Sequence, residues 1–309
     1  MRQCARQAGV ASMVAFLHDH FAIKSFSNRI DPMLQLTFAE KMLHTATRLQ
    51  TYQSGKEVAS GTGFFFDFKV GDFVFPSIVT NKHVLEGSDQ VVVTCHYKEP
   101  DDGPSEKVAR CRVATNPQTI VNHPDPDVDL CVIPFGPILG QAEDDNNPLF
   151  YLPLDDSVIP ATEDWERFDA IEEVVMVGCP RGLFDNFNNL PLMRRGITST
   201  PLGKRYLGKD EFMVDMACFP GSSGSPIFVY NPYQYSDRRL GGTIHGERVL
   251  FVGILYSGPT VTNRGEIVLG GLPRVEVAAM MHLGQAIRSS QLRAMPEVIS
   301  ARWHERPQR

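Results

Sequence analysis

The chain has 309 residues, 42% of them apolar, and a formal net charge of −6. The length allows two compact domains and the apolar content allows a sizeable core, so a wholly disordered chain is excluded. The acidic balance, without a block of lysine or arginine, argues against a nucleic-acid partner. No apolar run approaches the roughly 20 residues that span a bilayer, so no membrane span is expected.

Six cysteines occur singly along the chain, mostly in apolar, strand-like stretches. None forms a CxxC pair, so we expect no zinc site and no other metal. A buried cysteine behaves as a small hydrophobe, and a chain of this size needs no disulfide framework. The pattern favours a reducing compartment, with the cytoplasm as the expected location.

The first 40 residues are predicted to form a separate N-terminal segment. Val10, Met13, Val14 and Leu17 follow helical spacing, which favours a helix. Arginines followed by a short apolar stretch also fit a secretory signal, although no clear small-residue cleavage site follows. Whether this segment covers the rest of the protein or is removed stays open.

Strand-like segments follow in two series. The first predicts a β unit over residues 41–140, with short apolar segments separated by turns rich in glycine, aspartate and proline. An acidic, proline-containing connector covers 141–170, and a second series predicts another β unit over 171–275. Short strands with regular turn signals indicate an all-β sandwich or barrel.

The chain closes with a predicted helix and tail over 276–309. Val277, Met280 and Ile287 share one face of a helix that is expected to run from about residue 274 to residue 290. We expect this face to pack against the second β unit.

The strongest chemical signal is the glycine- and serine-rich stretch 220–226. A serine hydroxyl needs an adjacent base to act as a nucleophile, and the developing oxyanion needs hydrogen-bond donors. A tight turn flanked by glycines exposes the hydroxyl and directs backbone N–H groups toward one point. An ordinary turn between strands is the alternative for this stretch taken alone.

Three serines compete for the nucleophile, and the backbone distinguishes them. In such a site the donors are the N–H of the nucleophile and that of the residue two before it. For Ser222 that second residue is Pro220, which has no N–H. For Ser223 it is Gly221, which has an N–H and leaves room for a substrate. Ser225 would place a side chain at that position, so Ser223 is the best candidate.

The base must be a histidine, and the base needs a carboxylate that orients it. His83 ends an apolar strand at a polar turn, whereas His96, His123 and His245 lie in contexts that favour surface or structural roles. Asp129 directly precedes the apolar segment 130–133, where an unpaired carboxylate would be costly. Asp125 and Asp127 in the same loop fit simple turn chemistry.

With these residues in place, the sequence resembles the trypsin-like serine peptidases, especially the bacterial type without a PDZ domain or a disulfide framework. The matching pieces occur in the family's order of histidine, aspartate and serine. They are residues 61–64, 80–84, 127–130, 221–226 and 252–255.

The resemblance implies a chymotrypsin-like fold of two antiparallel six-stranded β-barrels, with the site in the cleft between them. It implies a serine endopeptidase in which His83, Asp129 and Ser223 form the catalytic triad and the N–H groups of Gly221 and Ser223 form the oxyanion hole. Its substrate would be a protein or peptide, and no metal or cofactor is required.

The resemblance also implies how substrates are selected. In the family the residue six before the nucleophile lies at the base of the primary pocket, and here that residue is Ala217. With Tyr256 and Gly258 near its wall, the pocket is expected to be apolar. Ser222 stands where secreted digestive members carry the aspartate that receives a freed N-terminus, so activation by that route is not expected.

Two other functions would use part of the same pattern. A peptide-binding or scaffold protein on the same fold would lack an activated serine, so a reagent that labels such serines distinguishes the two. An esterase on the α/β-hydrolase fold would carry its residues in the order serine, aspartate, histidine, which differs from the order here.

Overall fold

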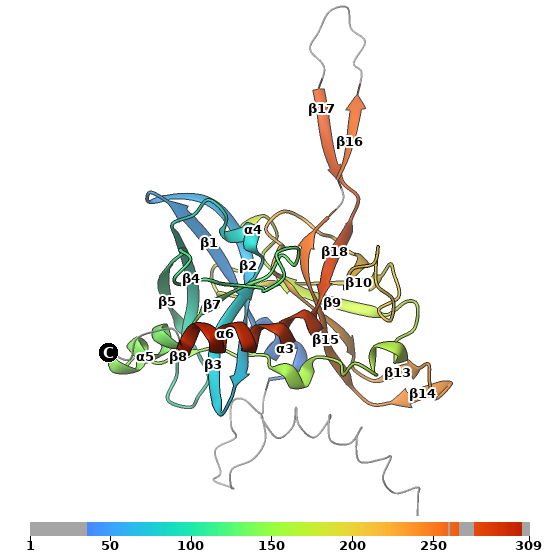
Figure 1. Ribbon diagram of the computed structural model, residues 1–309, viewed down its shortest axis with the longest axis horizontal. Helices are drawn as coiled ribbons and strands as arrows, with labels where there is room; N and C mark the ends of the chain where they lie inside the picture. The colour runs from blue at the N-terminus through green and yellow to red at the C-terminus, as the bar shows by residue number, and fades with distance from the viewer. Residues whose placement is uncertain (1–35, 259, 266–274, 305–309) are drawn as a thin grey trace, which may run out of the picture.

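β-Strands make up most of the chain, and they form two units that follow one another in sequence (Figure 1). The structure is a computed structural model that describes residues 36–258, 260–265 and 275–304. Almost all of the expected N-terminal segment therefore lies outside the described residues. The last residues of that segment, up to residue 40, begin helix α3, Phe38–Leu43. The Thr37 side chain caps this helix by accepting a hydrogen bond from the Glu40 backbone N–H.

The N-terminal unit is an eight-stranded antiparallel sheet. Its path runs β5-β4-β1-β2-β3-β7-β6, and β8 pairs with β4 off this path. Its elements are β1 Ala46–Gln53, β2 Lys56–Val70, β3 Phe73–Thr80, α4 Lys82–Leu85, β4 Gln90–Lys98, β5 Pro104–Ala114, β6 Val121–Asn122, β7 Cys131–Pro134, α5 Gly136–Asp144 and β8 Leu149–Phe150. The expected six-stranded barrel is not confirmed here. A barrel needs its end strands to pair, and among the described residues no ladder joins β5 to the two-residue β6.

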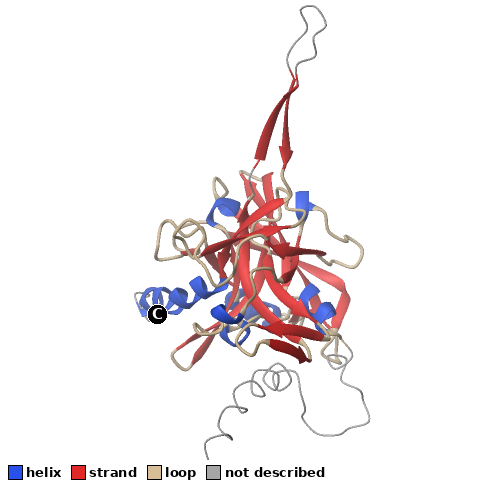
Figure 2. Ribbon diagram, turned by 90° about the vertical axis from the view of Figure 1, so that its right-hand side faces the viewer, coloured by secondary structure: helices blue, strands red, loops and turns tan. Residues whose placement is uncertain are grey.

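The C-terminal unit contains a closed six-stranded barrel, in the order β10-β11-β18-β15-β12-β9. Two hairpins, β13–β14 and β16–β17, extend from it, and Figures 1 and 2 show β16–β17 projecting away from the body. The strands are β9 Glu173–Gly178, β10 Leu192–Thr198, β11 Glu211–Asp215, β12 Pro226–Asn231, β13 Gln234–Asp237, β14 Gly242–His245, β15 Arg248–Ser257, β16 Thr260–Gly265, β17 Val275–Met280 and β18 Leu283–Arg288. Short 3₁₀ turns, η1 Asp156–Val158, η2 Trp165–Arg167, η3 Pro180–Gly182 and η4 Ser289–Ala294, connect these elements.

The helix expected over residues 274–290 is wrong. That stretch forms β17 and β18, and β18 pairs with both β11 and β15 to close the barrel. In β18 strand pairing on both sides outweighs the helical spacing, and Ala286 and Ile287 are buried there. β17 lies outside the barrel and pairs with β16 in the projecting hairpin. The second unit therefore extends past residue 275, and the C-terminal helix is α6, Met295–His304, which lies against the N-terminal unit (Figure 1).

The two units share a hydrophobic core. Phe64 of the N-terminal sheet packs edge-to-face on Phe251 of the barrel, with ring centroids 5.2 Å apart and both side chains buried. Met295 and Ile299 of α6 join the same core. Buried aromatic pairs of this kind add to the free energy of burial, so the two units are held in a fixed relation by packing.

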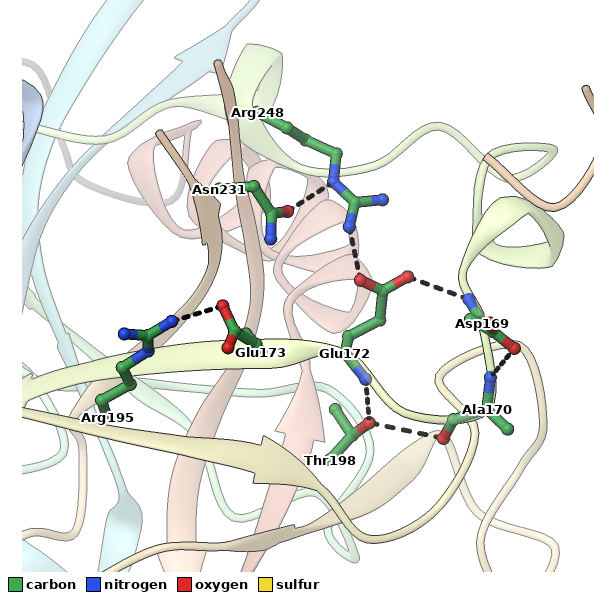
Figure 3. Close-up of polar contacts among 8 residues, drawn as sticks. All are labelled: Asp169, Ala170, Glu172, Glu173, Arg195, Thr198, Asn231 and Arg248. Atoms are coloured by element: carbon green, nitrogen blue, oxygen red, sulfur yellow. Dashed lines mark hydrogen bonds and ion pairs between the residues drawn. The ribbon is translucent and has the colours of Figure 1, made fainter. Parts of the chain in front are cut away.

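A buried ion pair joins the residue before β9 to the first residue of β15. Arg248 on β15 pairs with Glu172 and donates a hydrogen bond to the Asn231 side chain, 2.9 Å away (Figure 3). Glu172 also accepts from the Asp169 backbone N–H at 2.9 Å and donates its own N–H to Thr198 (Figure 3). Buried charges need such full pairing. Among the described residues, no helix is long and apolar enough to cross a membrane.

Candidate active site

His83 and Asp129 are joined directly. His83 lies in α4, the single turn that follows β3, and its Nδ1 is 2.5 Å from Oδ2 of Asp129. Asp129 directly precedes the residues that lead into β7, the strand beside β3. Because an ionised carboxylate only accepts hydrogen bonds, Nδ1 carries the proton and Nε2 has its lone pair free to accept one.

Backbone and side-chain contacts fix the orientation of this pair. The backbone N–H of His83 donates to Oδ1 of Asp129 at 3.2 Å, so the carboxylate binds His83 at two points. The buried Asn81 side chain donates to the Asp129 carbonyl at 2.7 Å. The His83 side chain keeps 42% of its surface exposed, which leaves its far edge open to a substrate.

The serine loop adopts backbone angles that require glycine at two positions. Gly221 and Gly224 both have φ of +86°. A Cβ on Gly224 would collide with the Thr62 carbonyl and come within 2.6 Å of the Thr80 hydroxyl. The loop thus lies against Thr80 at the end of β3, and Thr80 precedes His83 by three residues in sequence. The fold therefore brings the loop that carries Ser223 close to the strand end that leads to His83.

The peptide between Pro220 and Gly221 has a defined orientation. The backbone N–H of Arg181 donates to the Pro220 carbonyl at 2.5 Å. In a trans peptide the carbonyl and the next N–H point in opposite directions, so the Gly221 N–H faces away from Arg181. Within the described part of the chain, neither this N–H nor that of Ser223 has a hydrogen-bond acceptor. Both N–H groups are therefore available for a further hydrogen bond.

Thr62 ties the loop to the N-terminal sheet. Its backbone N–H donates to the Ser223 carbonyl at 2.9 Å, and its hydroxyl donates to the Gly221 carbonyl at 3.0 Å. The same hydroxyl accepts from the Cys179 N–H at 2.9 Å. One buried side chain on β2 thus connects both units at the serine loop.

Ser223 and His83 do not form a hydrogen bond with each other. The Ser223 hydroxyl donates to the Tyr256 carbonyl at 3.4 Å, a long and weak bond. Among the described residues, Nε2 of His83 has no hydrogen-bond partner. Contacts between catalytic groups are often long before a substrate binds.

In the described part of the chain, none of His96, His123 and His245 forms a side-chain hydrogen bond with Asp129 or Ser223. His123, expected at the surface, is buried, and its Nε2 donates to the Gln291 carbonyl of η4 at 3.1 Å. Burial lowers the pKa of His123. His96 is also buried between the carbonyls of Ser105 and Asn189. His245 lies in the β14 hairpin.

Of the three residues expected to form the primary pocket, Tyr256 contacts the serine loop directly. Tyr256 contributes its carbonyl to Ser223, while its hydroxyl donates to Glu211 at 2.9 Å. Burial and the Glu211 carboxylate raise the pKa of Tyr256. Gly258 follows β15, and the carbonyl of Ala217 accepts a hydrogen bond from the Arg194 guanidinium.

Three residues with contacts at the loop were not singled out as site residues from the sequence. Thr62 lies in the matching segment 61–64, which marked the region as part of the family pattern. Its contacts with Gly221 and Cys179 join residues far apart in sequence, so the sequence did not predict them. Arg181 and Arg194 occur in strand and turn contexts that resemble any surface arginine. Within the described ranges, no cluster of three or more histidine, cysteine, aspartate or glutamate side chains is arranged to bind a metal ion.

A comparison with protein families places these residues in a common domain. The model of the trypsin-like peptidase domain matches residues 61–231, which is more than half of the chain. The chain belongs to the trypsin-like peptidase domain family. The matched region of this trypsin-like domain includes His83, Asp129 and Ser223. No curated protein matches the chain.

Solved structures of serine proteases are distantly similar to this trypsin-like chain. The serine endoprotease from Yersinia pestis is 16% identical with a TM-score of 0.44, over 84% of this chain and 65% of that protease. The chain thus spans less than two thirds of that protease's length. The Rv3671c protease in its inactive form is 14% identical with a TM-score of 0.40, over 87% of this chain and 96% of its own.

Proposed function

We propose that this trypsin-like chain is a serine endopeptidase with His83, Asp129 and Ser223 as its triad. The observation that carries the proposal is the 2.5 Å contact from His83 Nδ1 to Asp129, which leaves Nε2 free to act as a base beside the serine loop. Membership of the peptidase family and the free N–H groups of Gly221 and Ser223 support it.

The reaction proceeds in two halves. Ser223 Oγ attacks the carbonyl carbon of the scissile peptide bond while Nε2 of His83 takes the hydroxyl proton, and the N–H groups of Gly221 and Ser223 bind the oxyanion. The carbon–nitrogen bond then breaks as His83 gives that proton to the leaving amine, which forms an acyl-enzyme. A water molecule, deprotonated by His83, then attacks the acyl carbon. The ester bond to Ser223 breaks, His83 returns the proton to Ser223 Oγ, and the acid product is released. Asp129 stabilises the imidazolium in both halves.

We further propose an apolar primary pocket with Ala217 at its base and Tyr256 and Gly258 near its wall. Ala217 offers no charge that could pair with a lysine or arginine side chain of the substrate. The substrate class is therefore a protein or peptide with an aliphatic or aromatic residue before the cleaved bond.

The alternative is a peptide-binding or scaffold protein with little activity, and the long bond from Ser223 to the Tyr256 carbonyl favours it. A fluorophosphonate probe distinguishes the two, because it reacts only with an activated serine. We expect covalent labelling that peptide mapping locates at Ser223 and that Ser223→Ala abolishes. A folded wild-type chain that binds peptides but takes no label would support the alternative.

A further inference from the structure

Arg194 on β10 lies behind the serine loop and contacts it at two points. One guanidinium nitrogen donates to the carbonyl of Ala217, and the other donates to the Ser222 hydroxyl at 2.9 Å. The Ser222 side chain is fully buried, so it points away from the substrate side and into the protein. The two acceptors lie on either side of Pro220, at the start and the end of the segment that leads to Ser223.

This arginine is unusual because its charge has no carboxylate partner. Within the described residues, no aspartate or glutamate forms an ion pair with Arg194, and its buried Nε has no hydrogen-bond partner. Burial lowers the pKa of its guanidinium, and the neighbouring titratable side chains are the thiols of Cys179 and Cys218. Those thiols stay protonated because burial raises the pKa of Cys179 to about 12 and of Cys218 to about 11.

A partly buried cation without a counter-charge is costly, and a hydrophobic side chain of similar size would be tolerated at least as well for stability. The contacts that Arg194 makes through its guanidinium are with the serine loop. The next residue, Arg195, gives the contrast: it is exposed and pairs with Glu173 at 2.5 Å on the outside of the barrel (Figure 3).

We propose that Arg194 is a positioning residue that holds segment 217–223 so that the N–H groups of Gly221 and Ser223 point toward the bound oxygen. Arg194 holds the segment at the Ala217 carbonyl and the Ser222 hydroxyl, while Arg181 holds the Pro220 carbonyl and Thr62 holds the Gly221 carbonyl. Because Arg194 belongs to β10, the chain itself supplies this support. The inference rests on the proposed peptidase function.

The test compares Arg194→Met with Arg195→Met as the matched control. Steady-state kinetics on a peptide with leucine before the cleaved bond gives kcat and KM, and a matched peptide boronic acid reports the binding of a tetrahedral adduct. For Arg194→Met we expect kcat to fall by about 10-fold to 100-fold, less than the roughly 10²-fold to 10³-fold loss on removing one oxyanion donor, because the two N–H groups are displaced and not removed. The boronate inhibition constant should rise in parallel and KM should stay within about threefold of wild type, since substrate binding does not use the oxyanion. Arg194→Lys should recover part of the kcat.

A second readout does not need activity. Hydrogen–deuterium exchange of peptides covering 217–225 should be faster in Arg194→Met than in wild type, and unchanged in Arg195→Met. Should Arg194→Met fail to fold, Ser222→Ala removes one of the two acceptors with little change in volume. It should raise exchange in the same peptides and lower kcat by a few-fold.

The outcomes separate the two hypotheses. Unchanged kcat, boronate affinity and exchange in Arg194→Met, or equal losses in Arg195→Met, would overturn the positioning role while leaving the peptidase intact. A wild-type chain that neither hydrolyses peptides nor reacts with the fluorophosphonate probe counts against the proposed function. In that case the exchange comparison alone decides whether Arg194 orders the loop.

Discussion

The Thr62 hydroxyl donates to the carbonyl of Gly221 at 3.0 Å, and this bond runs from the N-terminal sheet to the serine loop of the barrel. The same oxygen accepts from the N–H of Cys179 at 2.9 Å. The Gly221 carbonyl and the Cys179 N–H therefore both depend on the Thr62 hydroxyl, which belongs to β2 of the other unit. Loss of that hydroxyl should affect stability and the loop together.

We expect Thr62→Val to destabilise the fold by about 1–3 kcal/mol, because it leaves these two groups without a partner. It should also lower kcat, since the Gly221 carbonyl is no longer held. Urea unfolding and peptide hydrolysis measure the two effects. Thr62→Ser keeps the hydroxyl and is the matched control. Equal behaviour of the valine and serine variants would show that the hydroxyl plays no part.

Ser223→Ala should abolish hydrolysis, with a fall in kcat of at least about 10³-fold, and leave the melting temperature close to that of wild type. Ser225→Ala is the matched control. The Ser225 hydroxyl is buried without a hydrogen-bond partner, so its removal should be neutral or slightly stabilising and should preserve activity. If Ser225→Ala were the inactive variant and Ser223→Ala the active one, the nucleophile would be misassigned.

The intact chain should be active without cleavage to create a new N-terminus. Ser222 replaces the aspartate that would receive such a terminus, and its hydroxyl already accepts from Arg194. The measurement is hydrolysis by purified chain whose intact mass is confirmed after the assay. A variant lacking residues 1–35 is the comparison, because it separates removal of a covering segment from true activation. Activity that appears only with a specific new N-terminal residue would contradict this expectation.

Peptides with leucine or phenylalanine before the cleaved bond should be better substrates than peptides with arginine or glutamate. An apolar pocket gains roughly 0.8 kcal/mol for each methylene that is buried, whereas Ala217 offers no charge. Values of kcat/KM for four matched peptides make the comparison. A preference for glutamate would instead indicate that the Arg194 guanidinium, which contacts the Ala217 carbonyl, is accessible from the pocket.

Acid should destabilise the fold through His44. Burial, with a smaller effect of His96, lowers the pKa of His44 to about 4. In the unfolded chain the pKa of His44 is near 6.5, so between pH 4 and pH 6.5 the unfolded chain binds more protons than the folded protein does. Stability is thus retained above pH 6.5 and is lost as the pH falls toward 4, by roughly 3 kcal/mol in all.

His44→Phe is the variant that isolates this effect. The His44 ring packs edge-to-face on Phe150 at 5.2 Å, and phenylalanine keeps that aromatic contact without a titratable group. Urea unfolding at several pH values should show a smaller loss of stability between pH 6.5 and 4 in the variant than in wild type. Parallel pH profiles would mean that His44 titrates normally in the folded protein.

Local sequence determined most strands and the shape of the serine loop. Short apolar segments bounded by turn residues predicted strands that β2, β3, β4 and β12 confirm, because β-branched and aromatic residues favour an extended, buried backbone. The comparison of Pro220 with Gly221 made Ser223 the predicted nucleophile because backbone donors and positive φ are properties of single residues. The order of His83, Asp129 and Ser223 was likewise visible in the sequence alone.

Tertiary structure decided how the strands close and what supports the loop. Residues 283–288 form a strand in place of the predicted helix because they complete the barrel between β11 and β15. The contacts of Thr62, Arg181 and Arg194 with the loop join residues far apart in sequence. Pattern and propensity report what one segment prefers by itself, whereas strand pairing and buried hydrogen bonds depend on which distant segment supplies the partner.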